Sequence, residues 1–180
     1  VTGVDVAPEN IRYAKRYETP QLHFEVHDMR KILCSRCFDY VFNFFTSFGY
    51  FDQLHQNELA MRTMVTALKK GGVLVLDYIN SDYASQQLIA REVKTIKETD
   101  FLIERYEDAR YLYKKITVTD RQLPAPLTFT EKVCKFSAAE LQMLLQKEGL
   151  TILELKGDYQ LQPFDERRSP RLIVMAKREH

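Results

Sequence analysis

The 180-residue sequence has few cysteines, almost no net charge and no long apolar segment. Its three cysteines are too few, and odd in number, for a disulfide scaffold, which favours a reducing cytoplasm. No apolar run approaches the ~18 residues of a membrane span, and the N-terminus lacks the pattern of a signal peptide. Since 26 basic residues balance 25 acidic ones, the charge argues against a dedicated nucleic-acid binder. We therefore expect a cytoplasmic protein with neither a membrane span nor a nucleic-acid partner.

The sequence also lacks the short motifs that mark metal, phosphate and acyl-transfer chemistry. Cys34 and Cys37 form a lone CxxC, and neither Cys134 nor the histidines add zinc ligands at a matching spacing. A Gly-rich phosphate loop, a serine nucleophile elbow and an HExxH motif are all missing. We interpret Cys34 and Cys37 as ordinary thiols and expect no metal site.

Short apolar runs alternate with amphipathic stretches in the first part of the chain. A helix is predicted to begin at Pro8, and a longer one to run from about Gln53 to Lys69 and end at Gly71-Gly72. The predicted strands are Val1–Val6, Leu22–Val26, Phe38–Phe45 and Val73–Ile79. Because strands that alternate with helices form parallel βαβ units, we predict a Rossmann-like α/β fold. Its sheet should be mostly parallel, with helices on both faces.

The pattern changes after the Val73–Ile79 strand. From about Glu92 to Phe136, extended stretches rich in Tyr, Thr and charge predict an antiparallel β insertion. Ser137 and Glu140 form a capping box that opens a helix, and Gly149 ends it. The last two predicted strands are Leu150–Leu155 and Arg171–Ala176. Residues 1–180 should thus form a single domain with an insertion at about residues 92–136.

Two carboxylates follow neighbouring predicted strands. Ligands of open parallel sheets bind outside the carboxyl ends of the strands, where Asp5 could accept both hydroxyls of a ribose. Asp28 could accept from an exocyclic amine while Met29 packs on a ring. Taken alone, each carboxylate is better explained by an ordinary structural role, at a helix start for Asp5 and in a strand-to-helix turn for Asp28. Their occurrence on two neighbouring strands favours a nucleoside ligand.

The segment Asn43–Phe51 leaves the third predicted strand at the same edge. Eight of its nine residues are aromatic, hydroxylated or glycine. Aromatic walls with a few fixed polar groups are typical of a small-molecule pocket. The alternative is a buried core segment, which Gly49 and the hydroxyls of Thr46 and Ser47 fit poorly.

Taken together, these segments resemble a class I S-adenosylmethionine-dependent methyltransferase of the small bacterial-type subgroup. The order and spacing of several short motifs carry this resemblance, which covers most of the chain outside Glu92–Phe136. The motifs are Val4-Asp5-Val6, Asp28-Met29-Arg30, Phe38-Asp39-Tyr40-Val41, Ser47–Phe51, Leu68–Asp77, Gly157-Asp158-Tyr159 and Ser169–Lys177.

The resemblance implies S-adenosylmethionine as the cofactor and a small molecule as the methyl acceptor. The residues implied at the cofactor are Asp5, Val6, Asp28, Met29, Asn43 and Phe44. The residues implied at the acceptor are Ser47, Phe48 and Tyr50. The antiparallel insertion resembles a cap over the active site or a dimerisation surface. Methyl transfer is an in-line displacement that positioning and desolvation can support, so no catalytic residue is assigned.

In this family a first strand and a Gly-rich loop would lie immediately before Val1. The resemblance therefore implies an N-terminally incomplete enzyme, and the free edge of the Phe38–Phe45 strand would favour a homo-oligomer. Tyr106, Tyr111 and Tyr113 of the insertion are further candidates for such an interface. Three other hypotheses stay open: a binding or assembly module that has lost catalysis, an RNA or protein methyltransferase, and a dehydrogenase with a Rossmann site.

Overall fold

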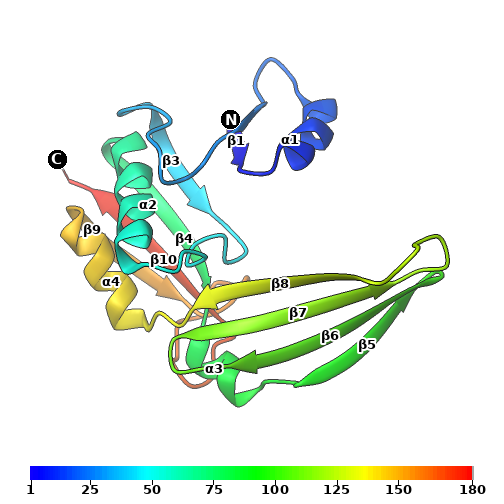
Figure 1. Ribbon diagram of the computed structural model, residues 1–180. Coiled ribbons are helices and arrows are strands. Elements are labelled where there is room, and N and C mark those ends of the chain that lie inside the picture. Colours follow the sequence, from blue (N-terminus) through cyan, green and yellow to red (C-terminus); the bar gives the residue numbers. More distant parts are fainter. Residues whose placement is uncertain (180) are drawn as a thin grey trace.

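In the computed structural model, which describes residues 1–179, the strands form three separate sheets (Figure 1). Strands β1 (Thr2–Asp5) and β2 (His23–Val26) make a parallel pair, connected through helix α1 (Pro8–Ala14) and a 3-10 turn at Lys15–Tyr17. The main sheet has the order β3 (Phe38–Asn43), β4 (Leu68–Ile79), β10 (Arg171–Arg178) and β9 (Leu150–Lys156). No helix within residues 1–179 is long and apolar enough to cross a membrane.

The main sheet is mixed, so the prediction of a mostly parallel sheet needs correction. Strands β3 and β4 are parallel, whereas β10 runs antiparallel to both β4 and β9. The cause lies in residues 157–170, which join β9 to β10 through turns and contain no helix. A parallel neighbour requires a long crossover, usually a helix, and without one β10 returns alongside β9. The broader prediction of an α/β fold is confirmed.

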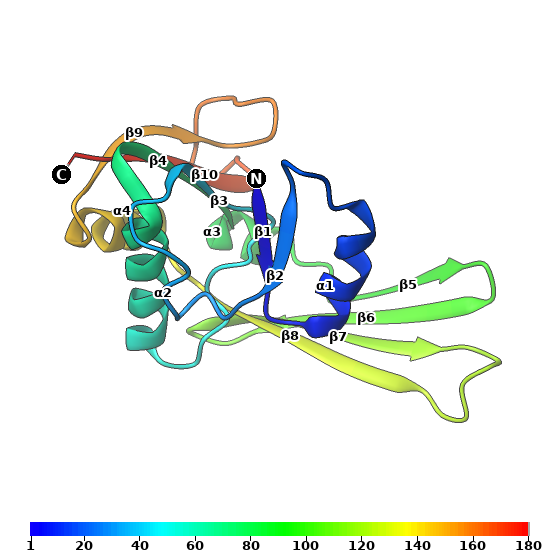
Figure 2. The same cartoon turned by 90° about the horizontal axis from the view of Figure 1, so that it is seen from above.

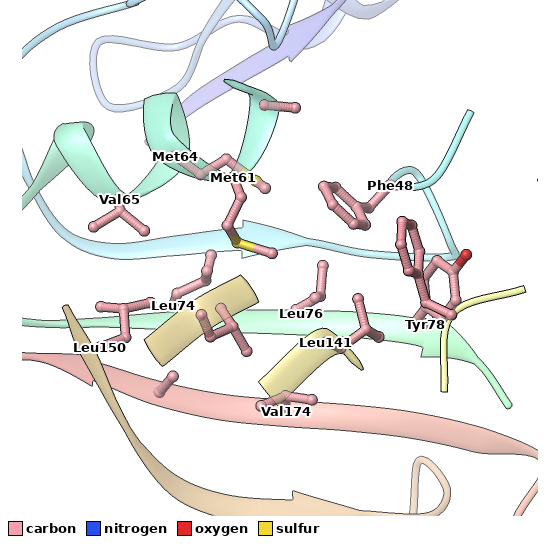
Figure 3. Packing of buried hydrophobic residues seen from close by; sticks show 14 of the residues in the cluster. Phe48, Met61, Met64, Val65, Leu74, Leu76, Tyr78, Leu141, Leu150 and Val174 are labelled. Carbon is pink, nitrogen blue, oxygen red and sulfur yellow. The ribbon is translucent and has the colours of Figure 1, made fainter. Parts of the chain in front are cut away.

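Helices α2 (Leu54–Ala67) and α4 (Ala138–Lys147) pack on the same face of the main sheet (Figure 3). The centre of this core consists of Met61, Val65, Leu74, Leu76, Tyr78, Leu141, Leu145 and Val174. Val41 pairs with Leu74, and Phe42 pairs with Val75. Because successive side chains of a strand point to opposite faces, Val41 and Phe42 lie on opposite sides of the sheet. Tyr40 and Phe42 are exposed on the far side, with their rings stacked at 6.0 Å. Within residues 1–179, helices therefore cover one face of this sheet, whereas cover on both faces was expected.

The start of α4 and the end of α2 are stabilised by different interactions. Helix α4 has the predicted capping box, in which Ser137 Oγ accepts from the Glu140 amide and the Glu140 carboxylate accepts from the Ser137 amide. Helix α2 ends at Ala67, and β4 begins at once with Leu68, so Gly71-Gly72 lies in the strand. The guanidinium of Arg178 donates to the carbonyls of Val65 and Leu68 at 2.8 Å each. We expected Gly71-Gly72 to end this helix. Instead, the helix ends earlier, and a side chain from β10 donates to the carbonyls at its end.

The third sheet matches the predicted insertion. Its strands are β5 (Arg91–Ile96), β6 (Thr99–Glu107), β7 (Tyr111–Thr119) and β8 (Leu127–Cys134), and all neighbours are antiparallel. The short helix α3 (Ser81–Gln86) leads into it from β4, and the sheet extends away from the core as a long arm (Figure 2). At its base, the Cys134 amide donates to the Gly49 carbonyl at 2.8 Å, and the Tyr78 hydroxyl donates to the Cys134 carbonyl. These bonds fix the arm against the loop that follows β3.

Gly49 makes this junction possible. It has a φ of +92°, and a Cβ there would lie 2.5 Å from Tyr78 Oη. Gly71 has a φ of +78° but nothing within 4 Å of its Cβ position. Both Gly→Ala changes share the left-handed backbone penalty, and only Gly49→Ala adds a clash. We expect Gly49→Ala to lower the free energy of unfolding by about 1–3 kcal/mol more than Gly71→Ala, measured by urea denaturation. Equal losses would contradict this account of the junction.

Candidate active site

Asp5 and the residues after β2 lie at the same edge of the small parallel sheet. Asp5 pairs with Val26, and the His27 amide donates to the Asp5 carbonyl at 2.9 Å. The Asp5 carboxylate accepts from the Ala7 amide at 2.7 Å and from Asn10 Nδ2 at 3.0 Å. It therefore supports the start of α1, as the structural alternative predicted, while the neighbouring Val6 is exposed.

Asp28 forms a close ion pair with Arg30. Arg30 Nε lies 3.0 Å from Oδ1 and its terminal nitrogen lies 2.6 Å from Oδ2. These hydrogen bonds lower the pKa of Asp28 to about 2. The same guanidinium stacks over the Phe51 ring, with 4.7 Å between Cζ and the ring centroid. Asp28 is thus ionised at neutral pH and is linked through Arg30 to the loop after β3.

The turn after β2 is anchored to helix α2. The Thr63 hydroxyl of α2 donates to the carbonyl of Met29, whose side chain packs against the hydrophobic core. Because Arg30 reaches Phe51 from this turn, the residues expected at the adenine lie next to the Asn43–Phe51 segment. The structure thus brings together two parts of the predicted site that are far apart in the sequence.

Asn43 lies at the carboxyl end of β3 and is nearly buried. Only 7% of the residue is exposed, and its Oδ1 has no hydrogen-bond partner among residues 1–179. A buried acceptor without a donor is costly, and a bound ligand can supply the missing donor. The next residue, Phe44, is exposed and stacks on Phe42 with 5.1 Å between ring centroids. Among the predicted cofactor residues, Asn43 therefore has the buried acceptor atom that a ligand can satisfy.

A cavity of about 380 Å³ lies between the loop after β3 and the antiparallel sheet. The loop contributes Phe45, Thr46 and Tyr50 to its lining, and α3 and the segment after it contribute Ala84 and Leu88. Burial and the nearby charge of Glu131 raise the pKa of Tyr50, so the group is a neutral donor at physiological pH.

The antiparallel sheet supplies an aromatic and charged wall to this cavity. Tyr106 and Tyr113 stack with 4.8 Å between centroids and 8° between ring planes. Two ion pairs also line it, Glu92 with Arg105 at 2.5 Å and Glu131 with Lys114 at 3.2 Å. Because each charge has a partner of opposite sign, the wall combines ring surface with polar groups and carries no net charge. Such a lining suits a small polar molecule with a ring or alkyl face.

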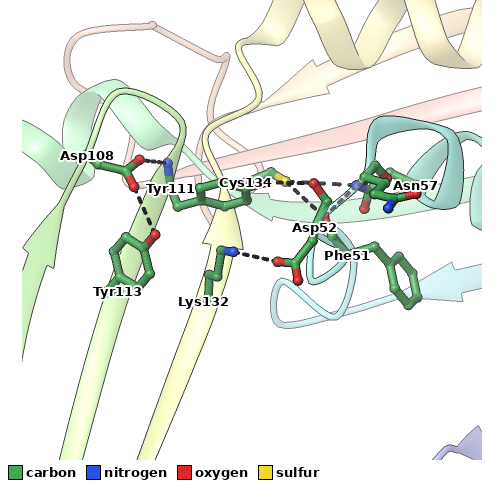
Figure 4. A network of polar contacts seen from close by, with 9 residues as sticks. Phe51, Asp52, Asn57, Asp108, Tyr111, Tyr113, Lys132 and Cys134 are labelled. Carbon is green, nitrogen blue, oxygen red and sulfur yellow. Dashed lines mark hydrogen bonds and ion pairs between the residues drawn. The ribbon is translucent and has the colours of Figure 1, made fainter.

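A polar network fixes this sheet onto the chain before α2 (Figure 4). The Tyr111 hydroxyl donates to the Asp52 carbonyl at 2.8 Å, and Lys132 forms an ion pair with the Asp52 carboxylate. Close by, Asn57 Nδ2 donates to the Phe51 carbonyl at 3.1 Å. The position of the cavity wall is therefore coupled to the start of α2.

The three residues expected at the acceptor lie in three different environments. Tyr50 lines the cavity, whereas Ser47 is exposed and donates to the Phe44 carbonyl at 2.7 Å. Phe48 is fully buried and packs in the core against Tyr78 and Phe136, so its expected place in the pocket is corrected. The left-handed Gly49 lies between Phe48 and Tyr50 and breaks the alternation that would point both the same way.

Sequence reasoning missed most of the cavity wall. We expected Tyr106 and Tyr113 at an interface between chains, and gave no role to Arg105 or Glu131. One signal was available, because the hairpin register pairs Tyr106 directly with Tyr113. The side on which this pair lies depends on how the arm docks, and that docking is set by contacts distant in sequence.

The CxxC motif also differs from the prediction. Cys34 and Cys37 form a disulfide, with 6.2 Å between their Cα atoms, rather than two ordinary thiols. Arg36 has a φ of 56°, and this left-handed turn brings the two cysteines together. Within residues 1–179, no group of three His, Cys, Asp or Glu side chains is placed to hold a metal ion.

Comparisons with known proteins agree with the resemblance read from the sequence. A family model described as a methyltransferase domain matches residues 1–155. The chain therefore belongs to the methyltransferase-domain family. No curated protein sequence matches it significantly.

Solved structures share the fold at low sequence identity. An S-adenosylmethionine-dependent methyltransferase from Clostridium acetobutylicum is 15% identical with a TM-score of 0.83, covering 99% of this chain and 75% of its own. The sugar N-methyltransferase KedS8 from Streptoalloteichus is 19% identical with a TM-score of 0.76, and the shares covered are 99% and 71%. The amino pentose methyltransferase CalS10 from Micromonospora echinaspora, solved with S-adenosylmethionine bound, is 19% identical with a TM-score of 0.71, covering 99% and 73%. At these identities the likeness establishes the fold.

Proposed function

We propose that this chain transfers a methyl group from S-adenosylmethionine to a small-molecule acceptor. The observation that carries the proposal is the buried Oδ1 of Asn43 at the carboxyl end of β3, which has no hydrogen-bond partner among residues 1–179. The family match and the activities described for the structural neighbours support the same reaction.

The side chains at this edge fit the groups of the cofactor. Asp5 would accept from the ribose hydroxyls, and Asp28, sharing its charge with Arg30, would accept from the adenine amine beside Met29. Asn43 Oδ1 would accept from the ammonium group of the methionine part. The exposed Val6 and Phe44 offer apolar surface next to these polar groups.

When bound, S-adenosylmethionine supplies a methyl group on a positively charged sulfur. The residues of this chain orient the acceptor and exclude water from it, and no general base needs to be assigned. Tyr50 would donate a hydrogen bond to the acceptor from the loop side, while Tyr106 and Tyr113 would hold its ring or alkyl face.

The cavity supports an acceptor of modest size with both polar groups and an apolar face. Its paired charges, Glu92 with Arg105 and Glu131 with Lys114, offer hydrogen-bond donors and acceptors on one wall. Sugars and amino sugars have this combination of hydroxyl or amine edges and flat CH faces, and two structural neighbours are described as acting on such molecules. We therefore place amino sugars first among the acceptors to be tested.

The cofactor assignment predicts a selective loss of affinity. Asp5→Ala should weaken S-adenosylhomocysteine binding by about tenfold or more, because it removes a charged acceptor worth about 1.5–3 kcal/mol. The matched control is Asp39→Ala, which removes an exposed carboxylate paired with Lys69 at the opposite end of β3. Both variants are titrated calorimetrically after their melting temperatures are recorded. If the two variants bound S-adenosylhomocysteine with equal affinity, Asp5 would not contact the cofactor.

The acceptor assignment predicts a loss of transfer without a loss of stability. We expect Tyr50→Phe to lower methyl transfer about tenfold, because the acceptor loses one buried hydrogen bond. Tyr40→Phe, on the exposed far face of the main sheet, should leave the rate unchanged. Transfer is followed from S-adenosylmethionine with a tritiated methyl group to a panel of amines, alcohols and amino sugars. Unchanged transfer by Tyr50→Phe would contradict the role of its hydroxyl.

A further inference from the structure

Asp77 is a fully buried carboxylate inside β4 to which the proposed cofactor and acceptor contacts assign no role. Its Oδ1 accepts from Arg171 Nε at 2.7 Å. Its Oδ2 accepts from the Phe45 amide at 2.8 Å and from the Tyr159 hydroxyl at 3.0 Å. One carboxylate therefore joins the loop after β3 to β10 and to the segment before it.

The same group of residues also holds Thr46. The Thr46 amide donates to the Asp77 carbonyl at 3.0 Å, and Arg171 donates to Thr46 Oγ1 at 2.9 Å. The Tyr159 ring packs edge-on to Phe45, with 6.3 Å between centroids. Side chain and main chain of Asp77 thus bind the amides of two successive residues.

These two residues have a backbone that L-amino acids disfavour. Phe45 has a φ of 57° and Thr46 a φ of 58°, and Thr is also β-branched. Consecutive left-handed residues other than glycine persist only where the surroundings hold them. Hydrogen bonds to a carboxylate that is paired with a guanidinium are stronger than those between neutral groups, so Asp77 is suited to hold this turn.

The turn lies between the two halves of the proposed site. Asn43 and Phe44 precede it at the end of β3, and Phe45 and Thr46 themselves line the cavity. Any change in the turn would move the cavity wall relative to Asn43.

Two C-terminal motifs supply the partners of Asp77. Gly157 allows Ser169 to approach so closely that a Cβ at Gly157 would lie 2.1 Å from Ser169 Oγ. The Arg171 amide donates to the Gly157 carbonyl at 2.9 Å. This close contact brings Gly157-Asp158-Tyr159 and Ser169-Pro170-Arg171 together at the carboxylate.

We propose that Asp77, Arg171 and Tyr159 form a positioning unit for methyl transfer. The unit holds the Phe45–Thr46 turn in its left-handed form, so that the acceptor cavity keeps its place beside Asn43. This proposal rests on the proposed function. Its three members act through the turn and do not themselves touch the reacting groups.

The test is residue-resolved amide hydrogen exchange by NMR on Tyr159→Phe, which removes one hydroxyl and keeps the ring. Its control, Tyr13→Phe, removes a hydroxyl that lies 3.2 Å from that of Tyr17 near α1. We expect the Phe45 and Thr46 amides to exchange at least about tenfold faster in Tyr159→Phe than in the control. The core amides of Leu74 and Leu76 should be unchanged. Equal exchange at the turn in both variants, or a uniform acceleration through the core, would overturn the proposal.

A second pair of variants tests the link through Arg171. Thr46→Val removes the hydroxyl that accepts from Arg171, and Thr46→Ser keeps it. Faster exchange at Phe45 in Thr46→Val and wild-type exchange in Thr46→Ser would support the unit, whereas equal exchange in both would count against it. None of these measurements needs a cofactor. A failure of S-adenosylhomocysteine to bind would therefore refute the proposed function and leave this result to be judged separately.

Discussion

The ion pair between Asp77 and Arg171 is the interaction on which the arrangement of this site depends. The Asp77 side chain is 1% exposed, and a buried charge is tolerated only when it is paired and hydrogen-bonded. Its hydrogen-bond partners come from the turn after β3, from β10 and from the segment before β10. One electrostatic requirement thus links β4, an inner strand of the main sheet, to the Phe45–Thr46 turn that lines the cavity.

The antiparallel arm is the second element of the site, and it is joined to the same strand. Tyr78 follows Asp77 and donates to the Cys134 carbonyl, while Gly49 accepts from the Cys134 amide. The arm is therefore bonded at Cys134 both to the loop after β3 and to the residue of β4 that follows Asp77. The aromatic pair Tyr106 and Tyr113 lines one wall of the cavity, and the loop after β3 forms the opposite wall.

The local features of this fold could be predicted, whereas those set by distant contacts could not. The Ser137–Glu140 capping box and the antiparallel arm depend on residues near one another, and the structure has both. The burial of Phe48 depends on how the elements dock, because the residues that it packs against, Tyr78 and Phe136, are distant in sequence. The pair of Asp77 with Arg171 spans 94 positions, and nothing near Asp77 in the sequence identifies its partner. Asn43 was expected at the cofactor from the family resemblance, but only the three-dimensional structure shows that its Oδ1 has no hydrogen-bond partner among residues 1–179.

The most direct test of the account is a crystal structure of the chain with S-adenosylhomocysteine. The account predicts the ligand's amino group within hydrogen-bond distance of Asn43 Oδ1 and its ribose at Asp5. The cavity beneath Tyr106 and Tyr113 should remain open next to the sulfur. A ligand bound elsewhere, with Asn43 Oδ1 still lacking a donor, would contradict the assignment of this edge as the methyl-transfer site.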